Sequence, residues 1–182
     1  MNNPCAIEPL TKVRHGRSLT VAVPTEPRAS ASGVIRVMTV SPHERDHENL
    51  NSILPPPRWV LHRARTLSSA VRQLKRYSPL PLVLCEHDLS PGSWLDMLEH
   101  IGHIERPPLL IVTSRFADER LWAEALNLGA YDVLAKPFDT TEVTRILSLA
   151  WSRWQKCETA SMQFQPPENP AGSIRELALS LR

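Results

Sequence analysis

Short apolar segments alternate with helix-like segments along most of the chain, and this alternation limits the folds that it can adopt. Residues 34–40 are rich in β-branched side chains, and residues 80–85 and 109–113 are almost wholly apolar. Such runs are typical of strands buried on both faces of a parallel sheet. The intervening segments, such as 67–77, repeat their apolar residues at helical spacing. This alternation predicts an α/β fold with a doubly wound, five-stranded parallel sheet and helices on both faces.

Local signals for starting and ending a helix set the boundaries of these elements. Ser93 and Asp139 can cap helix N-termini, because their side chains accept hydrogen bonds from free backbone N–H groups. Gly129 suits the left-handed position that often follows a helix. The predicted strands are 34–40, 59–62, 80–85, 109–113 and 131–135, and the predicted helices are 43–54, 67–77, 94–101, 118–128 and a long one after Asp139.

Composition divides the chain into three parts. Residues 1–33 have several prolines and no sustained periodicity, which predicts a disordered N-terminal arm. Residues 34–157 hold the α/β pattern, and residues 158–182 are predicted to be a linker with a short amphipathic C-terminal helix. This tail is too short for a DNA-binding domain, so we expect any transcriptional effect to pass through a partner.

The charge and hydropathy of the chain exclude some functions. The formal net charge is only +2, which argues against direct nucleic-acid binding, and no apolar run is long enough to cross a membrane. We therefore expect a cytoplasmic protein. Residues 50–85 hold no carboxylate and are either a solvated helix face or a docking patch for an acidic partner. Their basic residues are Arg58, Arg63, Arg65, Arg72, Lys75 and Arg76.

Ligands of doubly wound folds bind beyond the carboxyl ends of the strands, and the residues there carry a family resemblance. The chain resembles the receiver domains of bacterial two-component response regulators, which have a flavodoxin-like fold, from residue 34 to about 155. The Gly129-Ala130 pair followed by Lys136-Pro137-Phe138 is the most specific part. The matching segments are 83–92, 110–114 and 128–138.

The resemblance implies roles for individual residues of a phosphorelay signalling site. Glu86 stands where a receiver has its phosphate-accepting aspartate. Thr113 and Lys136 match the switch hydroxyl and the site lysine, and Pro137 implies a cis peptide bond. The chain thus has half of the expected site.

The other half is missing. Receivers hold magnesium with two carboxylates after the first strand, and Ser41 and Pro42 stand at these degenerate positions. Magnesium demands nearly octahedral oxygen ligation, and Glu86 is almost the only anionic candidate in the sequence around the site. We therefore expect no metal, no cofactor and no enzymatic activity, with phosphate transfer by the usual magnesium-dependent route lost.

Two interpretations of Glu86 remain open. Its side chain is one methylene longer than aspartate, so its carboxylate would lie near Thr113 and Lys136, where an aspartyl phosphate has its oxygens. It would then mimic the phosphorylated state of a pseudo-receiver that acts through protein–protein contacts. Alternatively, Glu86 and Lys136 simply pair, and the domain is a rigid scaffold.

Residues near the predicted site also allow other chemistries. Asp88 could be an atypical phosphate acceptor in a phosphorylatable regulator. The sequence His43-Glu44-Arg45-Asp46-His47 spells the H-E-x-x-H signature of zinc hydrolases, although an exposed first turn of a helix explains it as well. A metal cluster is a further alternative, but some of its members are predicted to lie in a buried strand and others at the exposed end of a helix. These members are Cys85, His87, Asp88, His100 and His103.

Three tryptophans lie on the last two predicted helices. Trp154 falls on the apolar stripe and is predicted to fill the core, whereas Trp122 and Trp151 fall outside the stripes. Receivers use this region for dimer and output contacts. We therefore treat Trp122 and Trp151 as candidate interface residues for a protein partner, with a homodimer through the last two helices as one form of contact.

Overall fold

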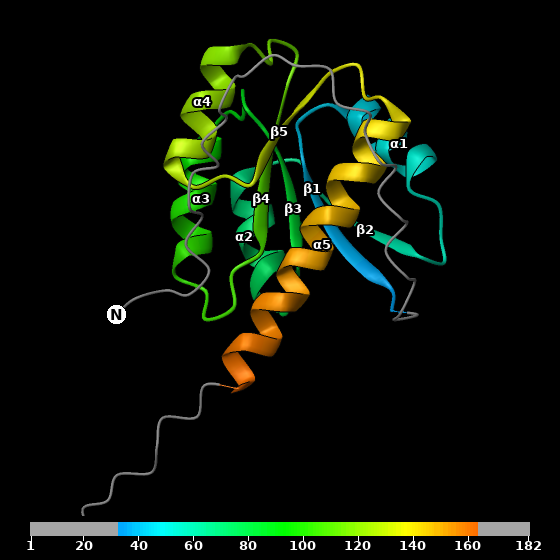
Figure 1. The fold of residues 1–182 in the computed structure, drawn as a ribbon. Helices are drawn as coiled ribbons and strands as arrows, with labels where there is room; N and C mark the ends of the chain where they lie inside the picture. Colours follow the sequence, from blue (N-terminus) through cyan, green and yellow to red (C-terminus); the bar gives the residue numbers. More distant parts are fainter. Residues whose placement is uncertain (1–32, 164–182) are drawn as a thin grey trace, which may run out of the picture.

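The apolar runs of the sequence form the strands of one parallel sheet. In a computed structural model, which describes residues 33–163, the strand order is β2-β1-β3-β4-β5 (Figure 1). The strands are β1 (Ile35–Val40), β2 (Trp59–Ala64), β3 (Leu82–Glu86), β4 (Leu109–Ser114) and β5 (Asp132–Ala135). The helices are α1 (Glu44–Ile53), α2 (Leu67–Arg76), α3 (Trp94–Gly102), α4 (Glu119–Leu128) and α5 (Thr140–Gln163). The predicted doubly wound parallel sheet is confirmed.

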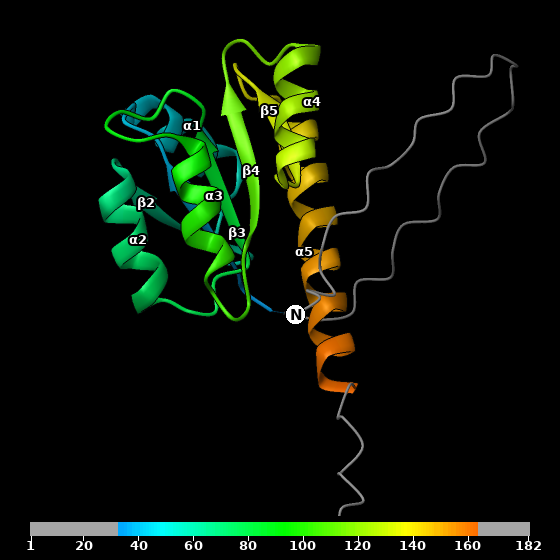
Figure 2. The same cartoon turned by 90° about the vertical axis from the view of Figure 1, so that its left-hand side faces the viewer.

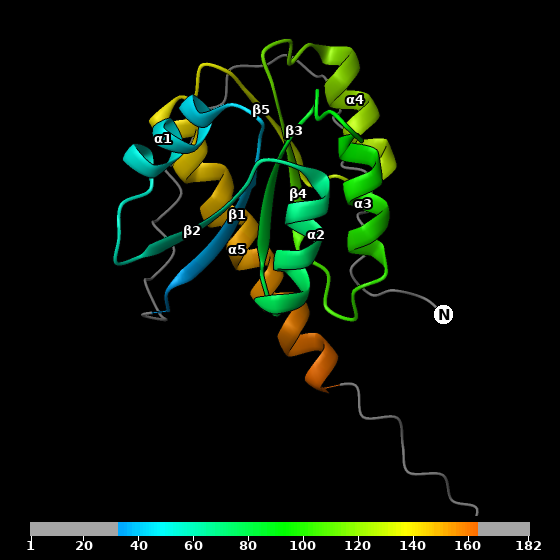
Figure 3. The same cartoon turned by 180° about the vertical axis from the view of Figure 1, so that it is seen from behind.

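Alternate residues of each central strand enter two separate cores. In β3, Leu82 and Leu84 pack toward α1 and α5, whereas Val83 and Cys85 pack toward α2, α3 and α4. This alternation follows from the two-residue period of a strand. Figure 2 shows α5 on the opposite side of the sheet from α2 and α3, and Figure 3 shows the face that α2, α3 and α4 cover. Both faces of the central strands are therefore buried.

The helix ends follow the capping residues. Ser93 accepts the Asp96 backbone N–H at 3.3 Å and Asp96 accepts the Ser93 N–H at 2.7 Å, which makes a capping box for α3. Gly129 has φ +107°, the left-handed conformation that a residue with a side chain rarely adopts. Because these signals are local, they could be predicted from the sequence alone.

The outer parts of the chain are described only in part. Helix α5 continues past Cys157, the predicted domain boundary, to Gln163. The predicted N-terminal arm, apart from residue 33, and the predicted C-terminal helix lie outside the described residues. Within residues 33–163, no helix is both long and apolar enough to span a bilayer.

Candidate functional site

The candidate site lies at the carboxyl ends of the central strands. Glu86 is the last residue of β3 and pairs in register with Thr113 near the end of β4. Lys136 follows β5 directly, and Ser41 follows β1. Since the strands are parallel, all four residues lie at the same edge of the sheet, the upper edge in Figure 1. The topology thus brings together residues that the sequence separates widely.

Glu86 is buried and bonded to two of its predicted neighbours. Its side chain accepts a hydrogen bond from the Thr113 hydroxyl at 3.2 Å and forms an ion pair with the Lys136 ammonium. Only 3% of Glu86 and 7% of the Lys136 side chain is exposed to solvent. A buried carboxylate needs such partners, because removing an unpaired charge from water is costly.

Asp46 on α1 is a second carboxylate of this site. It forms another ion pair with the Lys136 ammonium and accepts a hydrogen bond from the Ser41 hydroxyl at 2.5 Å. Burial alone would raise the pKa of Asp46, but the hydrogen bonds from Lys136 and Ser41 outweigh it and hold this pKa below its ordinary value. Asp46 is therefore ionised at neutral pH, and Lys136 lies between two anions.

The expectation of a site with Glu86 as almost the only anion is thus wrong. No carboxylate stands at positions 41 or 42, but α1 supplies one from its first turn. Asp46 lies four and eight positions before Leu50 and Leu54, which are both buried. This helical spacing was the signal in the sequence that could have placed Asp46 on the inner face of α1.

His47 corrects the prediction of an exposed first turn. It is only 1% exposed, because α1 packs its first turn against the end of β1. Its Nδ1 lies 2.7 Å from the Thr39 hydroxyl and its Nε2 lies 3.0 Å from the Ser41 carbonyl oxygen. Both ring nitrogens are occupied, so His47 cannot act with the exposed His43 as a zinc-ligand pair in this arrangement.

The buried His47 leads to a prediction about pH. Burial lowers the pKa of His47 from its ordinary 6.5, so the unfolded chain takes up a proton that the folded chain resists. The stability that depends on neutral His47 is then fully present above pH 6.5, and it declines as the pH falls below this value. We expect thermal unfolding scans from pH 7 to 5 to show a smaller loss of stability in His47→Gln than in the wild type, because the variant has no buried imidazole to protonate.

The exposed His100 provides the control for this prediction. The variant His100→Gln should show the same dependence of stability on pH as the wild type. The pKa of His62 is also lowered, by burial and by Arg36, but His62 is present in all three proteins and affects their pH dependence equally. Parallel curves for His47→Gln and the wild type would contradict the assignment of His47 as a buried neutral imidazole.

The donor set does not fit the magnesium ion that receivers use. Both anionic groups, Glu86 and Asp46, are bound to Lys136, and the Ser41 hydroxyl donates its proton to Asp46. The Ser41 carbonyl oxygen accepts from His47. A hard cation requires several free oxygen ligands. In this arrangement the Lys136 ammonium lies between the Asp46 and Glu86 carboxylates, where a metal ion would need to bind.

The alternative metal cluster is not assembled either. Cys85 is buried, and burial raises the pKa of its thiol to about 12, so it is not a thiolate at neutral pH. The Asp88 side chain is 74% exposed and accepts a hydrogen bond from His87 at 2.8 Å. His100 and His103 lie exposed at the end of α3. Across residues 33–163, no three ligating side chains of the His, Cys, Asp and Glu types converge to hold a metal.

The remaining candidate residues occupy distinct surroundings. The Lys136-Pro137 bond is cis, and Pro42 is exposed. Trp122 is 46% exposed on α4 and donates to Asp132 at 3.3 Å. Trp151 is half-buried and stacks on Trp154 with 5.6 Å between ring centroids.

Curated relatives are regulatory proteins. No family model matches the chain. The methanogenesis regulatory protein FilR1 of Methanothrix harundinacea is 34% identical over 107 residues, which are 55% of this chain and 23% of FilR1. The acid tolerance regulatory protein ActR of Rhizobium meliloti is 28% identical over 112 residues, 62% of this chain and 53% of ActR. The chain thus matches about half the length of one relative and a quarter of the other.

Solved structures with the same fold are receiver domains. The signal receiver domain of an HD domain-containing protein from Pseudomonas fluorescens Pf-5 has a TM-score of 0.61 and 25% identity, and the match covers 68% of this chain and 99% of that one. The beryllofluoride-activated NtrC4 receiver domain dimer has a TM-score of 0.57 and 23% identity, with 67% and 98% covered. Together with the strand order, these likenesses show that the described part of the chain has the fold of a response regulator receiver domain.

Proposed function

We propose that this receiver domain does not accept phosphate by the magnesium-dependent route and signals through protein–protein contacts, with Glu86 in place of a phosphorylated aspartate. The observation that carries the proposal is the position of Lys136 between two carboxylates, Glu86 and Asp46. Receivers of the usual type need a metal and an aspartate at this place. Here Lys136 supplies the positive charge of the site, and Glu86 and Asp46 supply its negative charges.

The contacts of Glu86 support the role of a phosphoaspartate mimic. Its carboxylate reaches both the Thr113 hydroxyl and the Lys136 ammonium, the two groups that the family resemblance assigns to the switch. Because both contacts exist without any modification, the site would be held permanently in one state. Phosphoryl transfer itself depends on cations that neutralise the developing charge, and the internal ion pairs leave none available.

A rigid scaffold is the second candidate function. Asp46 favours it, since this carboxylate gives Lys136 a partner that has no counterpart among the switch residues. In the scaffold, Glu86 and Asp46 only keep a buried lysine satisfied. The two candidates differ in whether replacing Glu86 alters the surface that a partner binds.

Protein partners, and not a reaction, carry the signal in either case. The exposed Trp122 on α4 and the half-buried Trp151 on α5 are the residues we assign to such contacts, because aromatic side chains are favoured anchors of interfaces. The NtrC4 receiver domain forms a dimer, and a homodimer of this chain through α4 and α5 is one form of the contact. We place the protein in the cytoplasm as part of the same proposal.

Incubation with acetyl phosphate and magnesium tests the proposal directly. Intact-mass spectrometry is expected to show the unmodified mass for the wild type, because the anions of the site are engaged with Lys136. A receiver domain with a complete acidic site serves as the positive control for the reagent.

A mass increase of one phosphoryl group would contradict the proposal. The variants Glu86→Gln and Asp88→Asn then locate the modified residue. Loss of the adduct in Glu86→Gln would show that Glu86 is an acceptor, and loss in Asp88→Asn would support the atypical phosphorylatable regulator.

A further inference from the structure

Three cations on the outer side of α2 have no anionic partner within residues 33–163. Arg72, Lys75 and Arg76 are exposed, and none of them lies within ion-pair distance of a carboxylate in the described structure. Arg63 and Arg65, in contrast, both pair with the Glu44 carboxylate of α1, so the two guanidinium groups together keep a net charge of only +1. Three of the six basic residues of segment 50–85 therefore lie together on one helix without a carboxylate partner in the described part of the chain.

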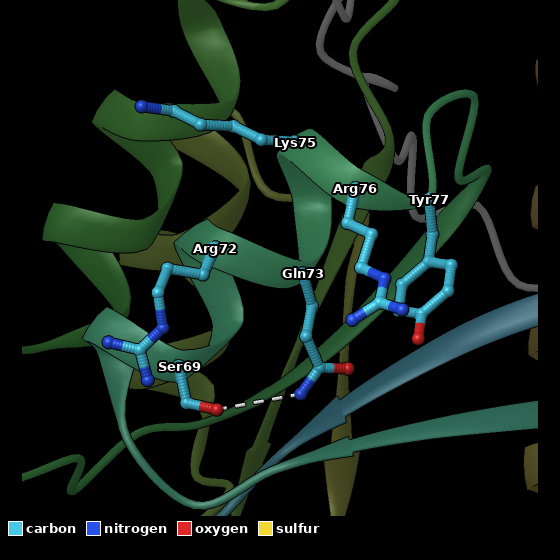
Figure 4. A pocket seen from close by; sticks show the side chains of 6 residues that line it. All are labelled: Ser69, Arg72, Gln73, Lys75, Arg76 and Tyr77. Atoms are coloured by element: carbon cyan, nitrogen blue, oxygen red, sulfur yellow. Dashed lines mark hydrogen bonds between the residues drawn. The ribbon is translucent and has the colours of Figure 1, made fainter.

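These cations border a shallow hollow of about 640 Å³. We call it the α2 surface, and its lining residues are Ser69, Arg72, Gln73, Lys75, Arg76 and Tyr77. Figure 4 shows Arg76 beside the ring of Tyr77, and the guanidinium carbon lies 5.5 Å from the ring centroid. Gln73 donates to the Arg63 carbonyl oxygen at 2.7 Å, which ties the middle of α2 to β2. The hollow is thus built on a fixed helix.

The spacing of the cations suits a line of carboxylates. Arg72 and Arg76 are four residues apart on α2, which places them on the same side of the helix about one turn apart. Lys75 lies next to them. Arginine binds carboxylates with two parallel hydrogen bonds, so Arg72 and Arg76 could each hold one acidic side chain of an extended or helical segment.

Nucleic acid fits this surface less well. The chain has a net charge of only +2, whereas nucleic-acid-binding domains usually present a strongly basic face. The α2 surface covers one helix of 10 residues, about 15 Å long, and Arg63 and Arg65, which share the Glu44 carboxylate, add only one net positive charge beside it. A short acidic protein segment matches both the length and the limited charge.

We propose that the α2 surface binds a short acidic segment of a partner protein through Arg72, Lys75 and Arg76. The aromatic face of Tyr77 provides an apolar contact beside the charges. This surface belongs to α2 and not to the site around Lys136, so it binds whether or not Glu86 mimics a phosphorylated aspartate. Exposed ion pairs are individually weak, so we expect a dissociation constant of about 10 μM to 1 mM.

An NMR titration of the full chain tests the proposal. The probe is a synthetic peptide of six glutamates, added to ¹⁵N-labelled protein at low salt. We expect saturable shifts of the amide signals of residues 67–77, and an affinity that falls several-fold when the salt rises from about 50 to about 300 mM. Single-stranded DNA and inorganic phosphate are titrated separately.

Two charge-reversal variants make the test specific. The variant Arg72→Glu/Arg76→Glu should bind the peptide at least tenfold more weakly than the wild type. The control Arg120→Glu/Arg145→Glu has the same net charge, with its changes at exposed positions of α4 and α5, and should keep most of the affinity. The milder Arg72→Gln/Arg76→Gln replaces the first variant if its spectrum shows that it is unfolded. Absence of saturable shifts, equal binding by the α2 variant, or a stronger response to DNA or phosphate would overturn the proposal.

Discussion

Replacing Lys136 with methionine is expected to lower the free energy of unfolding by about 3–5 kcal/mol. Methionine has a similar length but no charge, so Glu86 and Asp46 would be left buried without their common cation. Breaking a buried ion pair from one side is costly because the remaining charge has neither water nor a partner. Urea unfolding at pH 7, followed by circular dichroism, measures the loss.

Two further variants define what this loss means. Lys75→Met removes an exposed lysine and should change the stability by less than about 0.5 kcal/mol. Adding Glu86→Gln to Lys136→Met should recover part of the loss, since one of the two unpaired charges is then removed. If Lys136→Met unfolded within about 1 kcal/mol of the wild type, the ion pairs with Asp46 and Glu86 would not be the buried centre of this site.

In a separate variant, replacing Trp154 with alanine is expected to lower the free energy of unfolding by about 3–5 kcal/mol. Trp154 is 6% exposed, stacks on Trp151 and donates its indole N–H to the Pro107 carbonyl oxygen at 3.1 Å. Truncation leaves a large cavity between α5 and the sheet and an acceptor without its donor. The same urea experiment measures this loss.

Trp122 provides the comparison on the neighbouring helix. Because it is 46% exposed, Trp122→Ala should cost less than about 1 kcal/mol, while sedimentation velocity should show weaker self-association or partner binding if α4 forms the contact. Equal destabilisation by Trp122→Ala and Trp154→Ala would mean that both tryptophans are core residues.

The fold could be predicted from the sequence because its signals are local and repeated. Each central strand is a short apolar run, and the helix ends are marked by residues such as Ser93 and Gly129. These patterns determine the layers of the sheet without any knowledge of distant contacts. The strand ends then bring Glu86 and Thr113 together as neighbours in register.

The composition of the site could be predicted only in part. Asp46 and Lys136 are 90 residues apart, and no local pattern states that their side chains meet. His47 was expected on an exposed turn because polar residues usually face solvent there, but its partners Thr39 and Ser41 satisfy it inside. Both errors have one origin: the burial of polar groups depends on partners that only the tertiary structure supplies.

The shared lysine also constrains how this chain could change during evolution. Asp46, Glu86 and Lys136 together carry a net charge of −1 in a buried volume. A carboxylate in place of the buried Ser41, while Asp46 remains, would place three anions around one cation, which a buried site tolerates poorly. An acidic residue at position 41 would therefore be tolerated better once Asp46 is lost, so the charge that α1 contributes restricts the order in which these two positions can change.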